Sequence, residues 1–349
     1  MRAEILHGDC LSVLRSLPSE SVYCCVTSPP YWGLRDYGVA GQLGLEKTPE
    51  EYVGRMVDVF REVRRVLRED GVLWLNLGDS YAGSWGNQGR KEERGSQRPI
   101  NGPMLQRFAK HAPGCDMDED CSCLAKYAQR DSHTGSWVNE HPTLKPKDLV
   151  GIPWRVAFAL QADGWYLRSD IIWAKPNPMP ESVTDRPTKS HEYLFLLAKS
   201  ARYWYDAEAI AEAGAPKSAE RYGYAFGGAK SERLTAEEAD GPGTRTHPIG
   251  RRQFDGTRNA RSVWTIATQP YPEAHFATFP EEIPRRCIRA GCPVGGVVLD
   301  PFCGSGTTGA VAISEGREFV GIELNPAYVV LAEKRLRGAQ PPLFMADSP

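Results

Sequence analysis

The sequence predicts an α/β fold for this chain of 349 residues. Short apolar runs of strand length alternate with segments of helical periodicity, which is the pattern of strands joined by helices. Residues 49–68 form the clearest helix, because apolar side chains recur there every three or four positions and Pro49 stands at the start. Near the other end, a buried strand at 295–300 runs into a glycine-rich turn, a place where α/β sheets hold ligands.

The remaining elements follow from the same reasoning. Gly71 is expected to lie beyond the end of the 49–68 helix, and the apolar run after it is typical of a strand. Two stretches, 80–146 and 206–262, are polar and lack an apolar pattern. The expected order is strand 3–6, helix 10–17, strand 22–27, helix 49–68, strand 71–77, helix 148–162, strand 165–173, strand 192–198 and, within 279–337, helix, strand 295–300, turn, helix, strand 318–323 and helix.

Composition excludes several classes of protein. No apolar run reaches the length of about 18 residues that a membrane span needs. The N-terminus has no signal-peptide stretch, so we expect a cytoplasmic protein. Nine cysteines without a secretory signal indicate free thiols instead of a disulfide framework. A net charge of −2 argues against a protein that coats DNA, but not against an enzyme with a basic cleft.

One basic run stands out in the second polar stretch. It contains Arg245, Arg251, Arg252, Arg258 and Arg261. Such a run is either a solvated loop or a surface for phosphates and guanine edges, and both interpretations stay open.

The glycine-rich turn at 304–309 predicts a nucleoside-binding unit. Glycine is expected there because a side chain would keep the backbone away from the ligand. The spacing differs from the dinucleotide fingerprint, and the lysine of a phosphate-binding P-loop is missing. The next strand, 318–323, ends in Glu323, at the place where an acid hydrogen-bonds ribose hydroxyls.

Two motifs carry a resemblance to a known family. Asp300-Pro301-Phe302-Cys303-Gly304-Ser305-Gly306-Thr307-Thr308 resembles the S-adenosylmethionine loop of DNA amino-methyltransferases, and Ser28-Pro29-Pro30-Tyr31 resembles their catalytic loop. The catalytic loop comes first, as in the permuted β group of that family, which modifies cytosine N4 or adenine N6. Four further segments also resemble the family: 7–10, 172–177, 191–193 and 275–280.

The resemblance covers residues 4–80, 145–200 and 273–337, and it implies a Rossmann-like methyltransferase fold with a mixed, mostly parallel sheet, plus an insertion and a target-recognition region. The expected division of the chain is 1–80 for the catalytic-loop half, 81–146 for a polar insertion, 147–200 for the target-base pocket, 201–262 for target recognition and 263–340 for the cofactor-binding half.

The resemblance also implies S-adenosylmethionine as the cofactor, with no metal required for catalysis. Asp9 is expected to meet its adenine, and Glu323 its ribose. The residues implied to bind the cofactor are Asp9, Phe279, Pro280, Asp300, Pro301, Phe302, Gly304, Ser305, Gly306, Thr307 and Glu323.

The catalytic loop suits the chemistry of an exocyclic amine. Such a nitrogen is a poor nucleophile because its lone pair is delocalised into the ring, so accepting both of its hydrogens favours attack. Ser28 can supply one acceptor and the carbonyl of Pro29 another, and Pro29 and Pro30 hold both in place. Tyr31 can stack on a base flipped out of the duplex. No covalent intermediate is needed, so Cys24, Cys25 and Cys303 are expected to be structural.

The expected activity is site-specific methylation of duplex DNA. Members of the family with a serine at the position of Ser28 mostly methylate cytosine N4, so the resemblance favours cytosine N4 as the target. Adenine N6 is the alternative. RNA or protein-glutamine amino-methylation is disfavoured by the order of the loops, and a non-catalytic DNA-binding module by the presence of both loops. A cognate restriction endonuclease is a possible partner, and monomer and homodimer both stay open.

A zinc site is a further hypothesis within the first polar stretch. Its candidate ligands are Cys115, Cys121, Cys123 and His133. No paired C-x-x-C motif is present and acids crowd the stretch, so an acidic loop is the favoured interpretation.

Overall fold

The computed structural model describes residues 2–34, 37–82, 141–214, 257–269 and 279–339. These residues form an eight-stranded sheet in the order β1-β10-β9-β2-β3-β5-β4-β8. Its strands are β1 (Ala3–His7), β2 (Val22–Thr27), β3 (Leu67–Leu77), β4 (Tyr166–Ala174), β5 (His191–Ala198), β8 (Val263–Thr265), β9 (Val297–Asp300) and β10 (Glu318–Glu323). Neighbouring strands are parallel except that β5 runs antiparallel to β3 and β4. The predicted α/β fold with a mixed, mostly parallel sheet is confirmed.

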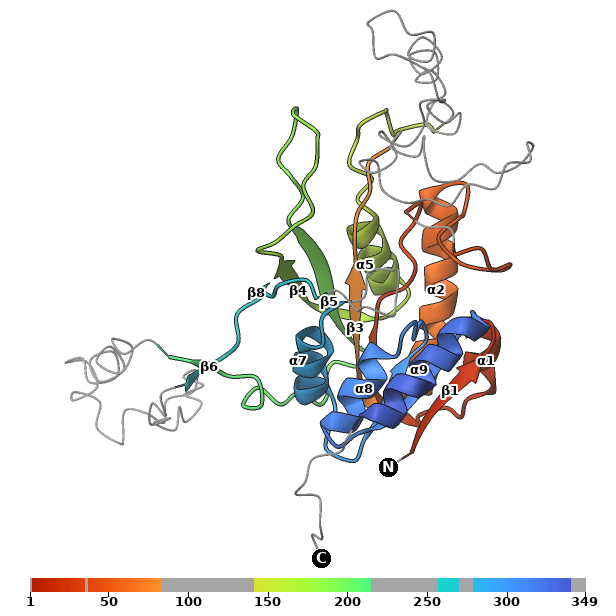
Figure 1. Cartoon of the computed structure of the whole chain (residues 1–349), viewed down its shortest axis with the longest axis vertical. Coiled ribbons are helices and arrows are strands. Elements are labelled where there is room, and N and C mark those ends of the chain that lie inside the picture. Colours follow the sequence, from red (N-terminus) through yellow and green to blue (C-terminus); the bar gives the residue numbers. More distant parts are fainter. Residues whose placement is uncertain (1, 35–36, 83–140, 215–256, 270–278, 340–349) are drawn as a thin grey trace, which may run out of the picture.

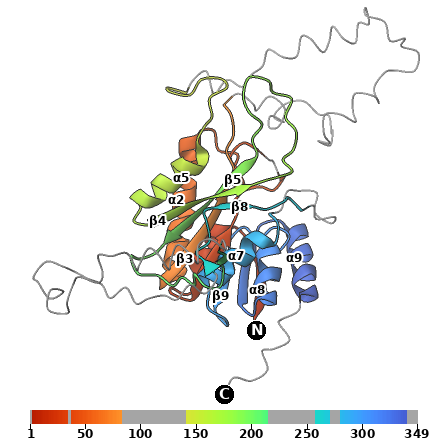
Figure 2. The same cartoon turned by 90° about the vertical axis from the view of Figure 1, so that its left-hand side faces the viewer.

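Helices cover both faces of the sheet. The helices are α1 (Cys10–Ser16), α2 (Pro49–Val66), α5 (Ile152–Ala162), α7 (Glu282–Gly291), α8 (Thr307–Ser314) and α9 (Pro326–Gly338). One apolar core lies under α1, α2 and α5, and a second lies under α7, α8 and α9. The two groups of helices lie on opposite sides of the strands in Figures 1 and 2. Successive residues of β3 alternate between the cores, with Leu73 in the first and Trp74 in the second, as the two-residue repeat of a strand requires.

Helix α2 shows why the apolar pattern predicts this fold. Thr48 caps its first turn by accepting a hydrogen bond of 3.2 Å from the backbone N–H of Glu51, and Pro49 follows at the first helical position. Tyr52, Met56 and Phe60 are completely buried on its inner face. Burial of side chains of this size stabilises a fold by about 1.5–3 kcal/mol each, so the apolar face decides where the helix packs.

Two element boundaries differ from the prediction. Strand β3 begins at Leu67, directly after α2, because Leu67 already pairs with Val22 of β2, so Gly71 lies inside the strand. Helix α5 begins at Ile152, four residues later than expected. The carboxylate of Asp79 accepts from the backbone N–H of Gly151 and of Ile152, both at 3.0 Å, and so fixes the start of the helix.

Segments far apart in the sequence meet in the middle of the sheet. Strand β9 lies beside β2, with Cys24 opposite Val298 and Cys25 opposite Leu299. The two strands are parallel, so the loops that follow them emerge at the same edge of the sheet. This placement brings the predicted catalytic loop and the predicted cofactor turn together.

Several predictions fall outside the described residues. These are most of the 81–146 insertion with its zinc candidates, and residues 215–256 of the recognition region with Arg245, Arg251 and Arg252. A short antiparallel ladder of β6 (Glu212–Ala213) and β7 (Thr257–Arg258) stands at the two ends of the latter gap. Within the described ranges, no helix combines the length and apolarity needed to cross a membrane.

Candidate functional site

Asp300 joins the two loops of the site. One of its carboxylate oxygens accepts a hydrogen bond of 2.6 Å from Thr27, the residue before the catalytic loop. The other accepts a bond of 2.7 Å from Thr308, at the start of α8. Asp300 is 2 % exposed, and this burial raises its pKa to about 6, although its hydrogen bonds act in the opposite direction. The residue expected in the cofactor cradle thus also fixes the spacing between cradle and catalytic loop.

The turn after β9 is built to admit a ligand. A Cβ placed on Gly304, whose φ is +53°, would meet no described atom within 4 Å except the carbonyl of Phe302, at 3.9 Å, so the described residues leave space open there. The backbone N–H of Gly304 donates a bond of 2.8 Å to Glu323, and Asn325 donates another of 2.8 Å to the same carboxylate. Burial raises the pKa of Glu323, and these bonds partly oppose the increase. An open turn beside a fixed carboxylate fits the ribose end of a nucleoside cofactor.

The other residues implied to bind the cofactor make protein contacts. Asp9 caps α1 by accepting bonds of 2.9 Å from the backbone N–H and 2.8 Å from the hydroxyl of Ser12, through a single carboxylate oxygen. Thr307 accepts a bond of 2.8 Å from Arg335 of α9, and the hydroxyl of Ser305 lies 3.4 Å from the same guanidinium. These two hydroxyls therefore hold α9 against the turn.

Five further members of that set lie near α7 and α8. Phe279 is half-buried against the second core, and the carbonyl of Pro280 accepts from Ile283 at the beginning of α7. Gly306 is the N-cap of α8. Pro301 is buried beside them and Phe302 is half-buried.

The catalytic loop, Ser28–Tyr31, is held from both sides. The phenol of Tyr52, a completely buried residue of α2, donates a hydrogen bond of 2.9 Å to the carbonyl of Pro30. Gly78 gives room to the ring of Tyr31, since a Cβ there would lie only 2.5 Å from a ring carbon. Among the described residues, no hydrogen bond reaches the carbonyl of Pro29. Within that part of the chain, the carbonyl expected to accept from the target amine therefore has no donor.

A hydrogen-bonded network lies behind this loop. The hydroxyl of Ser28 is 3.3 Å from both the phenol oxygen of Tyr31 and the amide oxygen of Asn76. The phenol of Tyr31 lies 2.7 Å from Glu192 and 2.9 Å from Asn76, and Glu192 forms an ion pair with Lys175. Burial, and then the charge of Glu192, raise the pKa of Tyr31 far above its usual range, so the phenol keeps its proton.

Asn76 and Tyr52 were not expected at the site. Asn76 is 2 % exposed, and its amide nitrogen donates a bond of 3.0 Å to the carbonyl of Tyr193. Its signal in the sequence is a polar residue inside the apolar run 72–77, because a buried amide needs partners. Tyr52 carries no such signal, since a tyrosine on the apolar face of a helix is ordinary core.

The cysteines near the site are buried free thiols. Burial raises the pKa of Cys24, Cys25 and Cys303 well above the usual value, which makes each a poor nucleophile. Their geometry agrees with the structural role expected of them.

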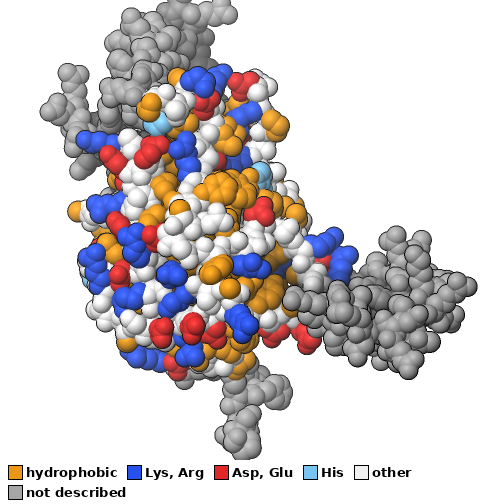
Figure 3. All heavy atoms as spheres, turned by 180° about the vertical axis from the view of Figure 1, so that it is seen from behind, with side chains coloured by type: hydrophobic (Ala, Val, Ile, Leu, Met, Phe, Trp, Pro, Cys, Tyr) orange, Lys and Arg blue, Asp and Glu red, His pale blue; other side chains and the backbone are white. Residues whose placement is uncertain are grey.

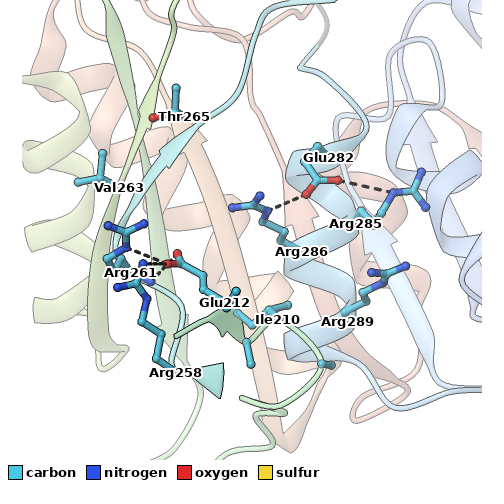
Figure 4. A pocket seen from close by; sticks show the side chains of 13 residues that line it. Ile210, Glu212, Arg258, Arg261, Val263, Thr265, Glu282, Arg285, Arg286 and Arg289 are labelled. Atoms are coloured by element: carbon cyan, nitrogen blue, oxygen red, sulfur yellow. Dashed lines mark hydrogen bonds and ion pairs between the residues drawn. The ribbon is translucent and has the colours of Figure 1, made fainter. Parts of the chain in front are cut away.

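Arg258 and Arg261, two candidates for DNA binding, lie in a pocket of about 580 Å³ between the β6–β7 ladder, β8 and α7 (Figure 4). Both pair with Glu212, at 3.1 and 2.8 Å. Helix α7 adds Arg285, Arg286 and Arg289 to the lining. On the face drawn in Figure 3, by contrast, basic and acidic side chains are interspersed. Arginine side chains from separate segments therefore converge at this pocket.

The comparisons with known proteins agree with this geometry. A family model described as DNA methylase, of the N6/N4 type, matches residues 22–334. Type II methyltransferase M.Cfr9I of Citrobacter freundii is 46% identical over 336 residues, which cover 96% of this chain and 88% of the relative. Type II methyltransferase M.XycI of Xanthomonas campestris pv. cyanopsidis is 47% identical over 334 residues, which cover 96% and 87% of the two chains.

Solved structures share the fold at low sequence identity. The PvuII DNA methyltransferase (cytosine-N4-specific) matches with a TM-score of 0.57 and 18% identity, over 100% of this chain and 89% of that one. TTHA0409 of Thermus thermophilus, solved in complex with S-adenosyl-L-methionine, matches with a TM-score of 0.52 and 22% identity, over 97% and 95% of the chains. Because the family model covers most of the chain and the relatives align over nearly its whole length, this protein belongs to the DNA methylase family of N4/N6 amino-methyltransferases.

Proposed function

We propose that this protein transfers a methyl group from S-adenosylmethionine to cytosine N4 at a specific site in duplex DNA. The observation that carries the proposal is that Ser28 and the carbonyl of Pro29, which accepts no hydrogen bond from the described residues, lie beside the cofactor turn linked by Asp300. The serine at the head of the loop, and the fold shared with a cytosine-N4-specific enzyme, favour cytosine. Adenine N6 is the alternative, since an amine there needs the same two acceptors.

The cofactor supplies an electrophilic methyl group when it is bound. Gly304 and Glu323 would hold it at its ribose, and Asp9 would lie toward its adenine. Ser28 and Pro29 would accept the two hydrogens of the target amine, which orients the nitrogen lone pair. The ring of Tyr31 would stack on the base, which must leave the duplex to reach a loop at the edge of the sheet. These groups are held before the substrate arrives, so little reorganisation is needed during the reaction.

We assign the pocket lined by Arg258, Arg261 and the arginines of α7 to the DNA-binding surface of the protein. Arg258 and Arg261 would contact phosphates or guanine edges, together with Arg245, Arg251 and Arg252. The named relatives are Type II methyltransferases, which supports a restriction endonuclease as partner in the cell.

Nucleoside mass spectrometry tests the proposal directly. Unmethylated plasmid DNA that contains many sequence contexts is incubated with the protein and S-adenosylmethionine, digested and analysed. N4-methylcytosine is the expected product, and a Ser28→Ala variant is the matched control. N6-methyladenine would keep fold, cofactor and loop chemistry but refute the assignment of the base. If neither modified base appeared on DNA of varied sequence, the proposed activity would be refuted.

A further inference from the structure

A continuous path of hydrogen bonds leads from the catalytic loop to a carboxylate that no step above uses. It starts at the hydroxyl of Ser28, passes the phenol of Tyr31 at 3.3 Å and reaches Glu192 at 2.7 Å. Glu192 lies at the amino end of β5, and its side chain is 16% exposed. The first contact, at 3.3 Å, is longer than the usual O–H···O range of about 2.5–3.0 Å, and catalytic contacts that are long without substrate often tighten when substrate binds.

The surroundings of Glu192 suit a proton acceptor. Lys175, directly after β4, forms an ion pair with it. The charged and titratable groups around it are Lys175, Tyr31, Lys189 and His191, and Lys189 in turn lies beside Asp79 and Glu181. Glu192 therefore pairs with Lys175, lies in the field of Lys189 and accepts from the phenol of Tyr31, which places a carboxylate at the end of the hydrogen-bonded path.

We infer that Glu192 receives the proton lost by the target amine, through Ser28 and Tyr31. The nitrogen lone pair would form the new N–C bond while the bond from the methyl carbon to sulfur breaks, with its electron pair left on sulfur. One N–H bond also breaks, and its electron pair stays on nitrogen. The proton goes to the Ser28 oxygen, the hydrogen of Ser28 to the phenol oxygen of Tyr31, and the phenol hydrogen to Glu192. Ser28 and Tyr31 end unchanged, and Glu192 ends as a neutral acid that loses its proton to water. Glu192 is thus a positioning residue, since it acts through Tyr31.

Asn76 takes a different part in the same network. Its amide oxygen lies 3.3 Å from the hydroxyl of Ser28 and 2.9 Å from the phenol of Tyr31, so it is the alternative acceptor for either hydroxyl, and its amide nitrogen donates to the carbonyl of Tyr193. An amide oxygen is far too weak a base to keep a proton at neutral pH. Asn76 therefore orients the two hydroxyls and does not transfer the proton. The path to Glu192 is the branch that ends at a base.

The inference rests on the proposed activity, and single-turnover methylation separates the two. Rates are measured across pH, at saturating DNA and cofactor, for the wild-type protein, Tyr31→Phe, Glu192→Gln and the double variant. Tyr31→Phe keeps the aromatic ring, and Glu192→Gln keeps an acceptor for the phenol. We expect each single variant to be slower by about 10²-fold, in the range that general-base catalysis supplies, and the double variant to be no slower than the worse single.

The pH profile is the readout that a structural role would not move. A relay that ends at a carboxylate works only while that carboxylate can accept a proton, so the wild-type rate should fall toward low pH, and both single variants should lose this part of the pH dependence. Asp300, whose pKa is raised to about 6, is present in all four proteins, so any change of rate that its ionisation causes is common to them. Affinity for S-adenosylmethionine, measured by calorimetry, should stay within about twofold, because neither residue touches the cofactor turn.

Glu62→Gln is the matched control. Glu62 is also a partly buried carboxylate in an ion pair, with Arg65 at 2.7 Å, but it lies on α2 away from the loop. Its rate and pH profile should match those of the wild-type protein. Each of three results would overturn the relay. The first is a wild-type methylation rate in Tyr31→Phe, and the second is an unchanged fall of the rate at low pH in Glu192→Gln. The third is a loss in the double variant equal to the product of the two single losses. Absence of methylation by the wild-type protein would instead refute the proposed function.

Discussion

Replacing Asp300 with asparagine should make the protein less sensitive to pH. The carboxyl is buried, and its pKa is raised from 3.8 to about 6. The folded state therefore keeps a proton on Asp300 that the unfolded chain has already lost, and stability falls as pH rises from about 4 to about 6. A pKa difference of this size corresponds to about 3 kcal/mol in the free energy of unfolding, since one pKa unit is worth about 1.4 kcal/mol.

Asparagine keeps the shape of the side chain and has no charge to bury. Its amide can accept from one of Thr27 and Thr308 and donate to the other, because a hydroxyl serves in both ways. The free energy of unfolding of the Asp300→Asn variant, relative to the wild-type protein, should therefore rise by about 2.4 kcal/mol between pH 4 and pH 7, because part of the full change already occurs below pH 4.

Urea unfolding, followed by circular dichroism at pH values from 4 to 7, measures this difference. Taking the difference between the two proteins removes contributions common to both, including most of that from Glu323, whose pKa is also raised by burial. A difference that stays constant with pH, or that falls as pH rises, would show that Asp300 is ionised in the folded protein without cost. The account of a buried carboxyl held by two threonines would then be wrong.

Three substitutions test the catalytic loop. Ser28→Ala should lower turnover by about 10²-fold and leave cofactor affinity near normal, and lost cofactor affinity would contradict the role given to Ser28. Tyr52→Phe should reduce the free energy of unfolding by about 1 kcal/mol, because the bond to the Pro30 carbonyl is lost; unchanged stability in thermal unfolding would count against that bond. Gly78→Ala should displace the ring of Tyr31 and cost about 1–3 kcal/mol of stability together with activity, so a fully active variant would disprove the close contact.

Local patterns were sufficient for most of the fold. The apolar repeat of α2, the buried runs of β2 and β9 and the turn at Gly304 depend on neighbours in the chain, so each was predictable. The start of β3 was not, because the polar residues between Leu67 and Gly71 conceal a strand that forms only by pairing with Val22. Likewise α5 begins where Asp79, far away in sequence, satisfies its first N–H groups.

The motifs alone predict the roles of the two loops, because each motif consists of contiguous residues with required backbone shapes and functional groups. How the loops meet depends on the packing of the sheet. The bond from Thr27 to Asp300 spans most of the chain, and the path from Ser28 through Tyr31 to Glu192 crosses from β2 to β5. Such contacts arise from the order of strands in the sheet, since parallel strands from distant segments bring their loops to one edge. A motif thus specifies which groups are available, and the sheet specifies which of them touch.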